Sequence, residues 1–390
     1  MITTPLTAPL FRGAAELEET GRGVRPHRLP AWVRAQFPDP QLLMVQRQPS
    51  GVRVAVRTAA RTVELVIHPT RVAYRGVDRP RGSVDLVVDG ALFASETLDG
   101  GDTVEVDLGT GQSELRTGAA YPVAFRGLPE GDKLVELWLP HYESVELAEL
   151  RTDEPVRPAE PGGPVWLHHG SSISQGSNAA TPARIWPAVA ARLGGVELRN
   201  LGFGGSAMVD QFTARVMRDS PAEFISVKFG INVVNLDAMH LRAFVPAVHG
   251  FLDTIRDGHP DTPLVLISPT FCEIHEDTPG PGAFDPDAFG EGRIKFVATG
   301  DPADGQRGRL TLRTVRDALS EVAERRTDDA NLHYLDGTAL YGEKDAAEHP
   351  LPDALHPDTD THRLIAERFA GYAFAPDGPF ASRGSAAVQS

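Results

Sequence analysis

A segment rich in proline and glycine divides this chain into two halves whose hydrophobic residues recur with different periods. The segment RTDEPVRPAEPGGP, residues 151–164, holds four prolines and two adjacent glycines. Proline removes backbone donors and glycine loosens the chain, so we expect no packed element here and predict a linker between two domains. The length of 390 residues fits two domains, because one hydrophobic core seldom serves so long a chain.

Residues 1–150 are predicted to form an all-β domain with an N-terminal extension. From about Leu42 to Leu150 the sequence returns to short apolar or alternating runs, among them GVRVAVRT, TVELVIHP, SVDLVVDGAL and KLVELWLP. The segments between these runs are rich in glycine, proline and aspartate, and no helical period stands out. Many short strands at this spacing are typical of a β-sandwich or jelly roll.

Trp138, in the run KLVELWLP, is a candidate for ligand contact in this domain. Along the run Val135 and Leu137 share one face, and Trp138 lies on the other. An exposed tryptophan would suit carbohydrate binding as a sugar-stacking platform. Because the sequence shows no aromatic cluster, we favour packing in the core or against the second domain.

After the linker, strands and helices alternate over residues 165–375. We predict strands at Val165–His169, Val196–Leu201, Phe224–Phe229, Leu264–Ile267 and Leu332–Leu335, and helices at Thr181–Leu193, Gln211–Arg218, Met239–Ile255, Leu310–Arg325 and Thr361–Phe374. Thr181 is the expected cap of the first helix, with Pro182 at its first position. Since parallel strands need crossovers, the alternation predicts an α/β domain whose parallel sheet is covered on both faces. Reactive groups in such sheets lie on loops at the carboxyl ends of the strands.

Two segments do not follow this alternation. Thr270–Gly308 spans 39 residues rich in glycine, proline and aspartate, which is too long for a plain connection. We interpret it as either a loop beside the substrate or a partly disordered segment. The tail, residues 376–390, is expected to be disordered.

Four loops that follow predicted strands carry the residue types of nucleophilic catalysis. GSSISQG places Ser171, Ser172 and Ser174 directly after the first strand, NLGFGGS ends the second, KFGINVVN ends the third, and LPDALHP follows the last. A serine hydroxyl is inert unless a base lies within hydrogen-bond reach and donors stabilise the oxyanion that forms. The loops offer hydroxyls, glycine and amide donors, and an aspartate three residues before a histidine. Spacing alone does not distinguish the three serines.

These four loops together resemble the sequence blocks of the GDSL, or SGNH, hydrolases over roughly Pro164–Phe374. GSSIS resembles the G-D-S-[LI] nucleophile block, and NLGFGG, GIN and DALHP resemble the second, glycine-x-asparagine and D-x-x-H-P blocks. The resemblance implies a three-layer α/β/α, flavodoxin-like domain. It further implies Ser172 as nucleophile, His356 as base and Asp353 as the residue that orients the imidazole. The implied oxyanion hole consists of the backbone N–H groups of Ser172 and Gly205 and the side-chain amide of Asn232.

Two positions depart from the family pattern. Ser171 stands where the nucleophile block has its aspartate, and Val233 stands where an aspartate often follows the asparagine. Neither departure removes a catalytic group. With its all-β region ahead of the hydrolase, the chain resembles the bacterial subgroup with an N-terminal jelly-roll domain. Some members of that subgroup are acyl-modifying enzymes of natural-product pathways.

We therefore expect a serine esterase, or acyl hydrolase, that cleaves a carboxylic ester of a small molecule through an acyl-enzyme on Ser172. No metal or organic cofactor is needed for this chemistry. An acyltransferase could use the same residues to pass the acyl group to an alcohol of a natural-product or sugar acceptor. A carbohydrate-binding protein that acts through its β-domain is the alternative from another class.

The loop GFGGSA also fits a dinucleotide-binding fingerprint. Gly202, Gly204 and Ala207 follow a predicted strand with the spacing G-x-G-x-x-A. The fingerprint should be followed by a strand that ends near an acidic residue about 20 positions on. The next strand ends in VKFGIN, which has no carboxylate. We therefore do not expect a nucleotide site.

HPDTDTH could be drawn as a metal site from His356, Asp358, Asp360 and His362. Polar residues just before a helix are more often caps, and a metal at His356 would compete with its role as base. We therefore expect no metal here. Asp336, which ends the fifth strand, is an alternative acid for the triad or a turn residue.

His168 and His169 end the first strand. One of them could face the pocket, but packed histidines are the favoured interpretation. The single cysteine, Cys272, excludes an intramolecular disulfide and is expected to be a buried apolar residue.

The overall charge and the N-terminal sequence limit the possible partners. The formal net charge is −15, from 38 Lys and Arg against 53 Asp and Glu, and no basic cluster occurs, so we expect no nucleic-acid partner. The N-terminus MITTPLTAPLFRGAAELEETGRG has no basic region followed by an apolar run. The sequence also lacks any stretch of ~20 apolar residues. We therefore expect a cytoplasmic protein without a membrane segment.

Overall fold

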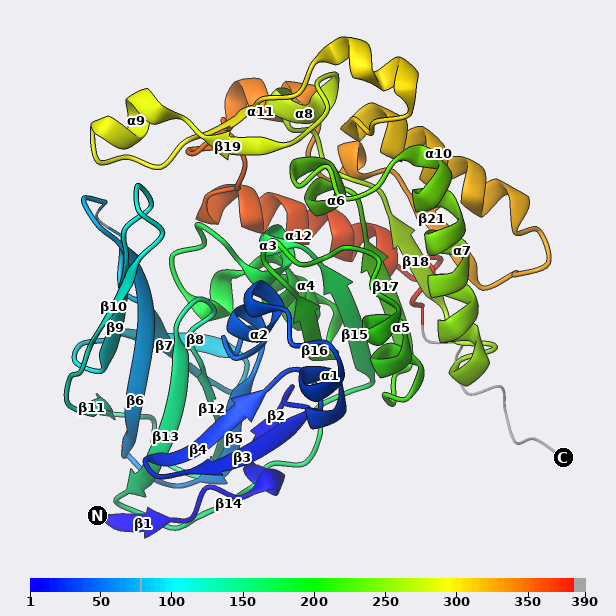
Figure 1. The fold of residues 1–390 in the computed structure, drawn as a ribbon. Coiled ribbons are helices and arrows are strands. Elements are labelled where there is room, and N and C mark those ends of the chain that lie inside the picture. Colours follow the sequence, from blue (N-terminus) through cyan, green and yellow to red (C-terminus); the bar gives the residue numbers. More distant parts are fainter. Residues whose placement is uncertain (78, 382–390) are drawn as a thin grey trace, which may run out of the picture.

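Two β-sheets face each other in the N-terminal half of the computed structural model, which describes residues 1–77 and 79–381 (Figure 1). One sheet has the order β10-β9-β6-β13-β4-β3, with β1 on β13 and β11 on β6; its strands are β1 (Ile2–Thr4), β3 (Glu16–Thr20), β4 (Gly23–His27), β6 (Thr62–Tyr74), β9 (Asp102–Val106), β10 (Ser113–Arg116), β11 (Tyr121–Arg126) and β13 (Ser144–Thr152). The other has the order β14-β5-β12-β7-β8, with β2 on β5; its strands are β2 (Phe11–Arg12), β5 (Arg53–Thr58), β7 (Ser83–Val88), β8 (Ala91–Thr97), β12 (Lys133–Trp138) and β14 (Val156–Pro158).

Apolar side chains from both sheets form one core between them. Val54 and Val56 of β5 belong to the same fully buried cluster as Leu65 and Ile67 of β6 and Leu137 of β12. Buried and half-buried residues alternate along the first part of β6, as expected for strands with one face toward the core. The predicted β-sandwich is confirmed.

A five-stranded parallel sheet lies at the centre of the second half. Its order is β16-β15-β17-β18-β21, from β15 (Val165–Gly170), β16 (Glu197–Gly202), β17 (Phe224–Lys228), β18 (Leu264–Ile267) and β21 (Leu332–Leu335). Helices α5 (Gln211–Arg218), α7 (Leu241–Gly258) and α10 (Leu312–Arg325) share a core with one face, and α4 (Trp186–Gly194) and α12 (Thr359–Ala373) share a core with the other. The strand order is that of flavodoxin-like folds, so the predicted three-layer α/β/α domain is confirmed.

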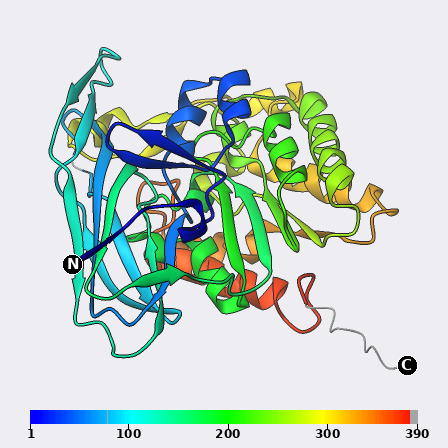
Figure 2. The ribbon, with the colours of Figure 1, turned by 90° about the horizontal axis from the view of Figure 1, so that it is seen from below.

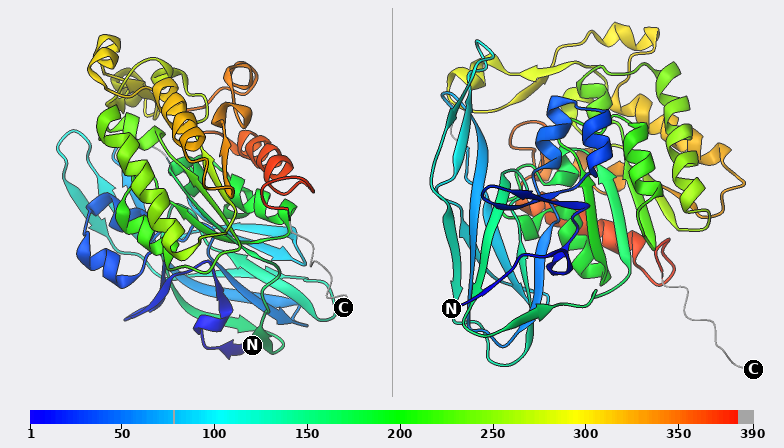
Figure 3. Two further views of the ribbon diagram at one scale, coloured as in Figure 1. Left: turned by 90° about the vertical axis from the view of Figure 1, so that its right-hand side faces the viewer. Right: turned by 60° about the horizontal axis from the view of Figure 1, so that its bottom comes forward.

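Two helices of the N-terminal half join the α5 and α7 layer. Helices α1 (Ala31–Gln36) and α2 (Pro40–Gln46) lie beside α5 and α7 in two views (Figures 2 and 3). Phe37 stacks on Phe212 of α5 at 5.0 Å between ring centroids. The prediction of strands from about Leu42 onward missed α2. The sequence signal for this helix was the pair Asp39 and Pro40. Aspartate is a frequent N-cap and proline a frequent first residue of a helix. In the structure the Asp39 carboxylate accepts a hydrogen bond from Leu42 N at 2.8 Å and caps the helix.

Trp138 lies in the interface between the two halves. Its side chain is 2% exposed and belongs to a core with Trp166 and Trp186 of the α/β domain. The guanidinium of Arg53 lies 4.7 Å from the centre of the Trp138 ring system. The favoured interpretation, packing against the second domain, is confirmed, and the ring is not a sugar-stacking platform.

The segment predicted as an unpacked linker contains a strand. Residues 156–158 form β14, which pairs antiparallel with β5 at the edge of its sheet. An edge strand tolerates proline, because one side of its backbone needs no partner, so Pro158 does not prevent pairing. The expectation that nothing packs in residues 151–164 was therefore wrong.

The predicted helix at Thr181–Leu193 is interrupted. A 3-10 turn, η2 (Pro182–Arg184), is followed by α4, and Ile185 between them is extended. A continuous helix would place Pro187 against the carbonyl of Ala183 and lose a hydrogen bond, so the helix restarts with this proline in its first turn. The Thr181 hydroxyl does not cap the turn but donates to the Asp85 carboxylate at 2.6 Å.

The long segment after β18 has its own secondary structure. It contains α8 (Glu273–Glu276), β19 (Gly282–Phe284), α9 (Pro286–Gly290), β20 (Phe296–Ala298) and η3 (Pro302–Arg307). The interpretation as a partly disordered segment was therefore wrong, and the interpretation as a loop beside the substrate stays a prediction. Shorter elements elsewhere are η1 (Ala8–Leu10), α3 (Ser172–Gln175), α6 (Ile231–Asn235), η4 (Gly337–Ala339) and α11 (Glu343–Glu348).

The disordered tail was predicted to begin at residue 376, but a later residue of this segment is buried. Phe380 is 2% exposed and stacks on Phe224 at 5.0 Å between ring centroids. Phe380 is therefore packed against the α/β domain, and residues 382–390 lie outside the described part of the chain. Within the described residues, no helix combines the length and the apolar character needed to cross a membrane.

Candidate active site

Ser172, His356 and Asp353 form a chain of hydrogen bonds at the carboxyl end of the parallel sheet. Ser172 opens α3 directly after β15, and its Oγ lies 2.9 Å from His356 Nε2. The other ring nitrogen, His356 Nδ1, lies 2.8 Å from Asp353 Oδ2. The Ser172 hydroxyl can therefore donate to a ring whose opposite N–H donates to a carboxylate, which is the geometry of a serine nucleophile with an oriented base.

Asp353 is fixed by several donors besides the imidazole. Its Oδ1 accepts from the backbone N–H groups of Leu355 at 3.0 Å and His356 at 2.7 Å, and its Oδ2 accepts from Asn178 Nδ2 at 3.0 Å. Burial alone would raise the pKa of Asp353, but the hydrogen bonds and charge interaction with His356 and the backbone donors outweigh it and lower the pKa. The carboxylate is thus held ionised beside the histidine.

The structure separates the three serines that spacing alone could not rank. The Ser171 hydroxyl accepts a hydrogen bond from Ile173 N at 3.3 Å and caps α3. Ser174 Oγ lies 2.8 Å from the buried His168 Nε2. Of these serines, Ser172 is the one in contact with His356.

The predicted oxyanion donors lie on three segments that contact one another. A Cβ added to Gly204 would lie 3.5 Å from Ser172 Cβ, so the glycine loop after β16 passes against the serine. Asn232, 4% exposed at the start of α6, accepts a hydrogen bond from Ala207 N at 3.1 Å through Oδ1. This hydrogen bond uses the amide oxygen of Asn232. The side-chain NH2 group of Asn232 is the donor that could bind an oxyanion.

Gly202 and Gly204, the glycines of the dinucleotide fingerprint, have a packing role in the structure. A Cβ on Gly202 would lie 2.5 Å from Gln175 N, and Gly204 N donates to Gln175 Oε1 at 2.7 Å. Both glycines allow the strand end to pack against α3, which explains their presence without a cofactor.

His168 and His169 are packed, as favoured. His168 Nδ1 lies 2.7 Å from Ser226 Oγ, and burial lowers the pKa of His168 well below its usual value. His169 Nδ1 donates to Leu201 O at 2.7 Å, and burial lowers its pKa to about 4. Both rings are neutral and buried near the carboxyl end of β15.

The residues drawn as a metal site have other partners. Asp358 caps α12 by accepting from Thr361 N at 2.9 Å. His362 is fully buried, accepts from Trp186 N at 3.2 Å and donates to Ser177 O at 3.0 Å. No group of three or more potential metal ligands occurs among the described residues. Asp336 is a turn residue, whose Oδ1 accepts from Thr338 N at 2.9 Å.

Phe296 is a site residue that the sequence did not indicate. Its backbone N–H donates to Asp353 O at 2.9 Å, and its ring stands edge to face with His356 at 5.5 Å. Phe284, opposite Phe296 in the β19 and β20 hairpin, contacts Tyr74 of β6 at 6.2 Å between ring centroids. The hairpin therefore links the β-sandwich to the imidazole. A proline- and glycine-rich segment gives no periodic signal by which this could be found.

Cys272 contacts the backbone of Ala354, the residue after Asp353. Its thiol donates to Ala354 O at 3.4 Å, and burial raises its pKa to about 12. The expected buried cysteine is confirmed.

Comparison with known proteins agrees with this geometry. Residues 169–364 match the GDSL-like Lipase/Acylhydrolase family. The chain belongs to this family. Residues 10–148 match the family described as SsfX3, N-terminal domain, so the combination of a β-rich N-terminal domain with an SGNH domain is also shared. The matched region includes Ser172 and His356 of the GDSL-like domain.

Solved structures similar to this GDSL-like protein cover both halves. The salicylyl-acyltransferase SsfX3 from a tetracycline biosynthetic pathway is 29% identical, with a TM-score of 0.77 over 94% of this chain and 95% of that one. A putative GDSL-like lipase from Bacteroides ovatus is 19% identical, with a TM-score of 0.64 over 92% and 93%. A family two carbohydrate esterase from Clostridium thermocellum is 13% identical, with a TM-score of 0.55 over 83% and 90%. The last two show the fold alone. A search of curated proteins found no match.

Proposed function

We propose that this protein is a serine esterase that cleaves a carboxylic ester of a small molecule through an acyl-enzyme on Ser172. The observation that carries the proposal is the chain from Ser172 Oγ to His356 Nε2 at 2.9 Å and from His356 Nδ1 to Asp353 Oδ2 at 2.8 Å. Each distance suits a hydrogen bond, and the order of groups suits proton removal from the hydroxyl.

In the first half of the reaction, Ser172 Oγ attacks the ester carbonyl while His356 Nε2 takes the hydroxyl proton. The resulting oxyanion is stabilised by the N–H groups of Ser172 and Gly205 and by the Asn232 amide. When the tetrahedral intermediate collapses, the bond to the alcohol breaks and His356 gives its proton to the leaving oxygen. Asp353 keeps the ring oriented and stabilises its charged form.

In the second half, the acyl group leaves Ser172. His356 removes a proton from water, the oxygen attacks the acyl-enzyme carbonyl, and the acid is released as the proton returns to Ser172 Oγ. At the end of the reaction each catalytic group of the protein is back in its starting form.

An acyltransferase is the second candidate, because an alcohol can replace the water in this step. The likeness to the salicylyl-acyltransferase SsfX3 over 94% of this chain favours it. The two activities differ in whether the site holds an acceptor and excludes water.

Replacement of the nucleophile tests the proposal. We expect Ser172→Ala to lose at least about 1,000-fold in kcat on p-nitrophenyl acetate and to lose labelling by a fluorophosphonate. Ser174→Ala, two residues away, is the matched control for labelling. Full activity in Ser172→Ala, or labelling of another residue, would contradict the proposal. Mass analysis of products, with and without added alcohols, then separates hydrolysis from transfer.

A further inference from the structure

Two glutamine side chains hold the backbone of Gly204, one from each half of the chain. Gln41 Nε2, on α2, donates to Gly204 O at 2.8 Å. Gln175 Oε1, on α3, accepts from Gly204 N at 2.7 Å. The glycine that passes against Ser172 is therefore held at both of its polar backbone atoms.

The contact at Gly204 O also sets the direction of the next N–H group. Gly204 C=O and Gly205 N–H belong to one planar trans peptide unit, in which they point in opposite directions. With the carbonyl directed at Gln41, the Gly205 N–H is directed away from it. Gly205 has φ +68°, and a Cβ there would lie 3.2 Å from Gln41 Nε2, so the glutamine sits against this turn.

Gln175 joins the same loop to the nucleophile and to the β-sandwich. It lies three residues after Ser172 in α3 and is 5% exposed. Its Nε2 donates to His141 O at 3.0 Å and to the Gln48 side chain, both from the N-terminal half. Ser50 Oγ of that half also donates to Gln175 O at 2.6 Å. The two amides thus form one network that crosses the domain boundary.

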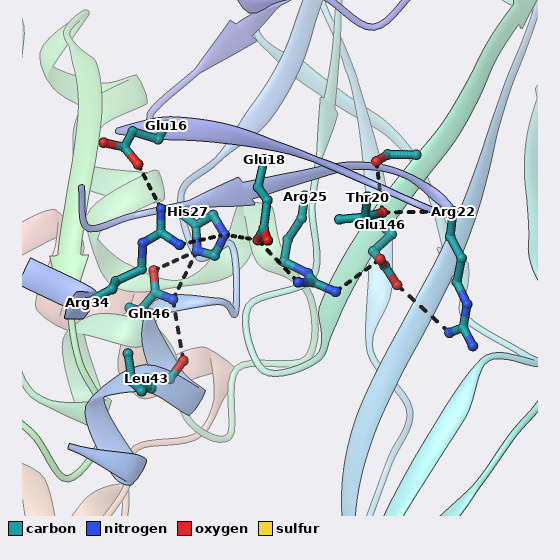
Figure 4. Close-up of polar contacts among 11 residues, drawn as sticks. Glu16, Glu18, Thr20, Arg22, Arg25, His27, Arg34, Leu43, Gln46 and Glu146 are labelled. Atoms are coloured by element: carbon teal, nitrogen blue, oxygen red, sulfur yellow. Dashed lines mark hydrogen bonds and ion pairs between the residues drawn. The ribbon is translucent and has the colours of Figure 1, made fainter. Parts of the chain in front are cut away.

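Helix α2, which carries Gln41, is held near its C-terminal end by buried polar contacts. The buried Arg28 guanidinium donates to Val45 O of α2 at 2.6 Å and also to Gly202 O at the end of β16. At the end of α2, the Gln46 amide contacts His27, which lies 2.7 Å from the Glu18 carboxylate in a polar network that continues to Arg25 (Figure 4).

We propose that Gln41 is a positioning residue that orients the Gly205 N–H toward the oxyanion, so the N-terminal half completes the active site of the α/β domain. This inference rests on the proposed acyl-enzyme chemistry. It goes beyond it by giving the N-terminal helices a role in the reaction. Gln41 itself is exposed and belongs to no hydrophobic cluster, so we expect its replacement to leave the fold intact.

The test compares kcat and KM of the full chain on p-nitrophenyl acetate. Loss of one oxyanion donor costs about 100-fold or more in kcat, and a misdirected donor costs less. We expect Gln41→Ala to lower kcat about tenfold with KM within twofold. Gln41→Glu, which has the same shape but repels the Gly204 carbonyl, should lower kcat further. Gln36→Ala, an exposed glutamine on α1, is the matched control and should keep wild-type kcat. Melting temperatures check that all three variants are folded.

The possible failures are distinguishable. If Ser172→Ala is inactive while both Gln41 variants keep kcat within twofold, the positioning role is overturned and the proposed function stands. A loss that appears in KM alone also overturns it, because an oriented oxyanion donor acts in the transition state. If the wild-type protein neither turns over esters nor reacts with a fluorophosphonate, both proposals fall.

Discussion

At the scale of single residues, Asp353 accounts for the arrangement of the site. Its two oxygens accept from three other residues, so the carboxylate is placed before the imidazole binds to it. A group held this way limits both the tautomer and the rotation of the ring. Asp336, the competing acid, has its carboxylate directed at the Thr338 backbone and hydroxyl instead.

We therefore expect Asp353→Asn to lower kcat about 100-fold or more, because the amide can stabilise neither the charged imidazole nor the required tautomer. Asp336→Asn is the matched control and should keep activity within twofold. The check is the kcat of both variants on p-nitrophenyl acetate. Comparable losses in the two would mean that the acid of the site is wrongly assigned.

At the scale of elements, the β19 and β20 hairpin forms one wall beside His356. Figure 1 draws this segment reaching from the α/β domain over the ends of β6, β9 and β10. The rings of Tyr74, Phe284 and Phe296 form a continuous row that ends at His356. All three residues are half-buried.

From the position of Phe296 beside His356 we predict an effect on which acyl groups the enzyme prefers. We expect Phe296→Ala to raise KM for p-nitrophenyl benzoate severalfold while KM for the acetate changes less than twofold, because stacked rings contribute about 1 kcal/mol. Phe289→Ala, which removes a ring 6.4 Å from Phe284 but leaves the contact of Phe296 with His356 in place, is the control. Equal changes for both esters would show that Phe296 supports the fold of the site and does not select the acyl group.

Several helices and strands have the bounds that the sequence predicts. The α5 helix, Gln211–Arg218, and the strands Leu264–Ile267 and Leu332–Leu335 are found at their predicted bounds, because local periodicity decides them. The block residues Ser172 and His356 are also brought together as the resemblance implied. Gln41, Gln175 and Phe296 act through partners 29 to 163 positions away, in hydrogen bonds or ring contacts that no local pattern encodes.

At the scale of the whole molecule, the two halves share buried polar groups as well as a core. The fully buried Asp85 of the sandwich accepts from Thr181 Oγ1 at 2.6 Å and from Ala183 N at 2.8 Å. Arg53 pairs with Glu197 across the same boundary. A carboxylate or guanidinium buried in an interface is costly once its partner leaves, so the halves are expected to separate only when the protein unfolds.

Buried histidines give this molecule an acid-sensitive stability. Burial lowers the pKa of His141 to about 3 and the pKa values of His169 and His362 to about 4. Unfolding returns each ring to its ordinary pKa near 6.5, so between these values the unfolded chain binds more protons than the folded one. The stability is therefore fully present above pH 6.5 and is lost as the pH falls from there toward 4.

From pH 7 to pH 5 each of these rings should lower the free energy of unfolding by about 2 kcal/mol. Asp210, whose pKa burial raises to about 6, acts in the opposite direction with about 1 kcal/mol, so a net loss of several kcal/mol remains. Urea unfolding at the two pH values measures this difference. A free energy of unfolding that stays constant or rises at pH 5 would mean that the three rings are already charged, or open to solvent, in the folded protein.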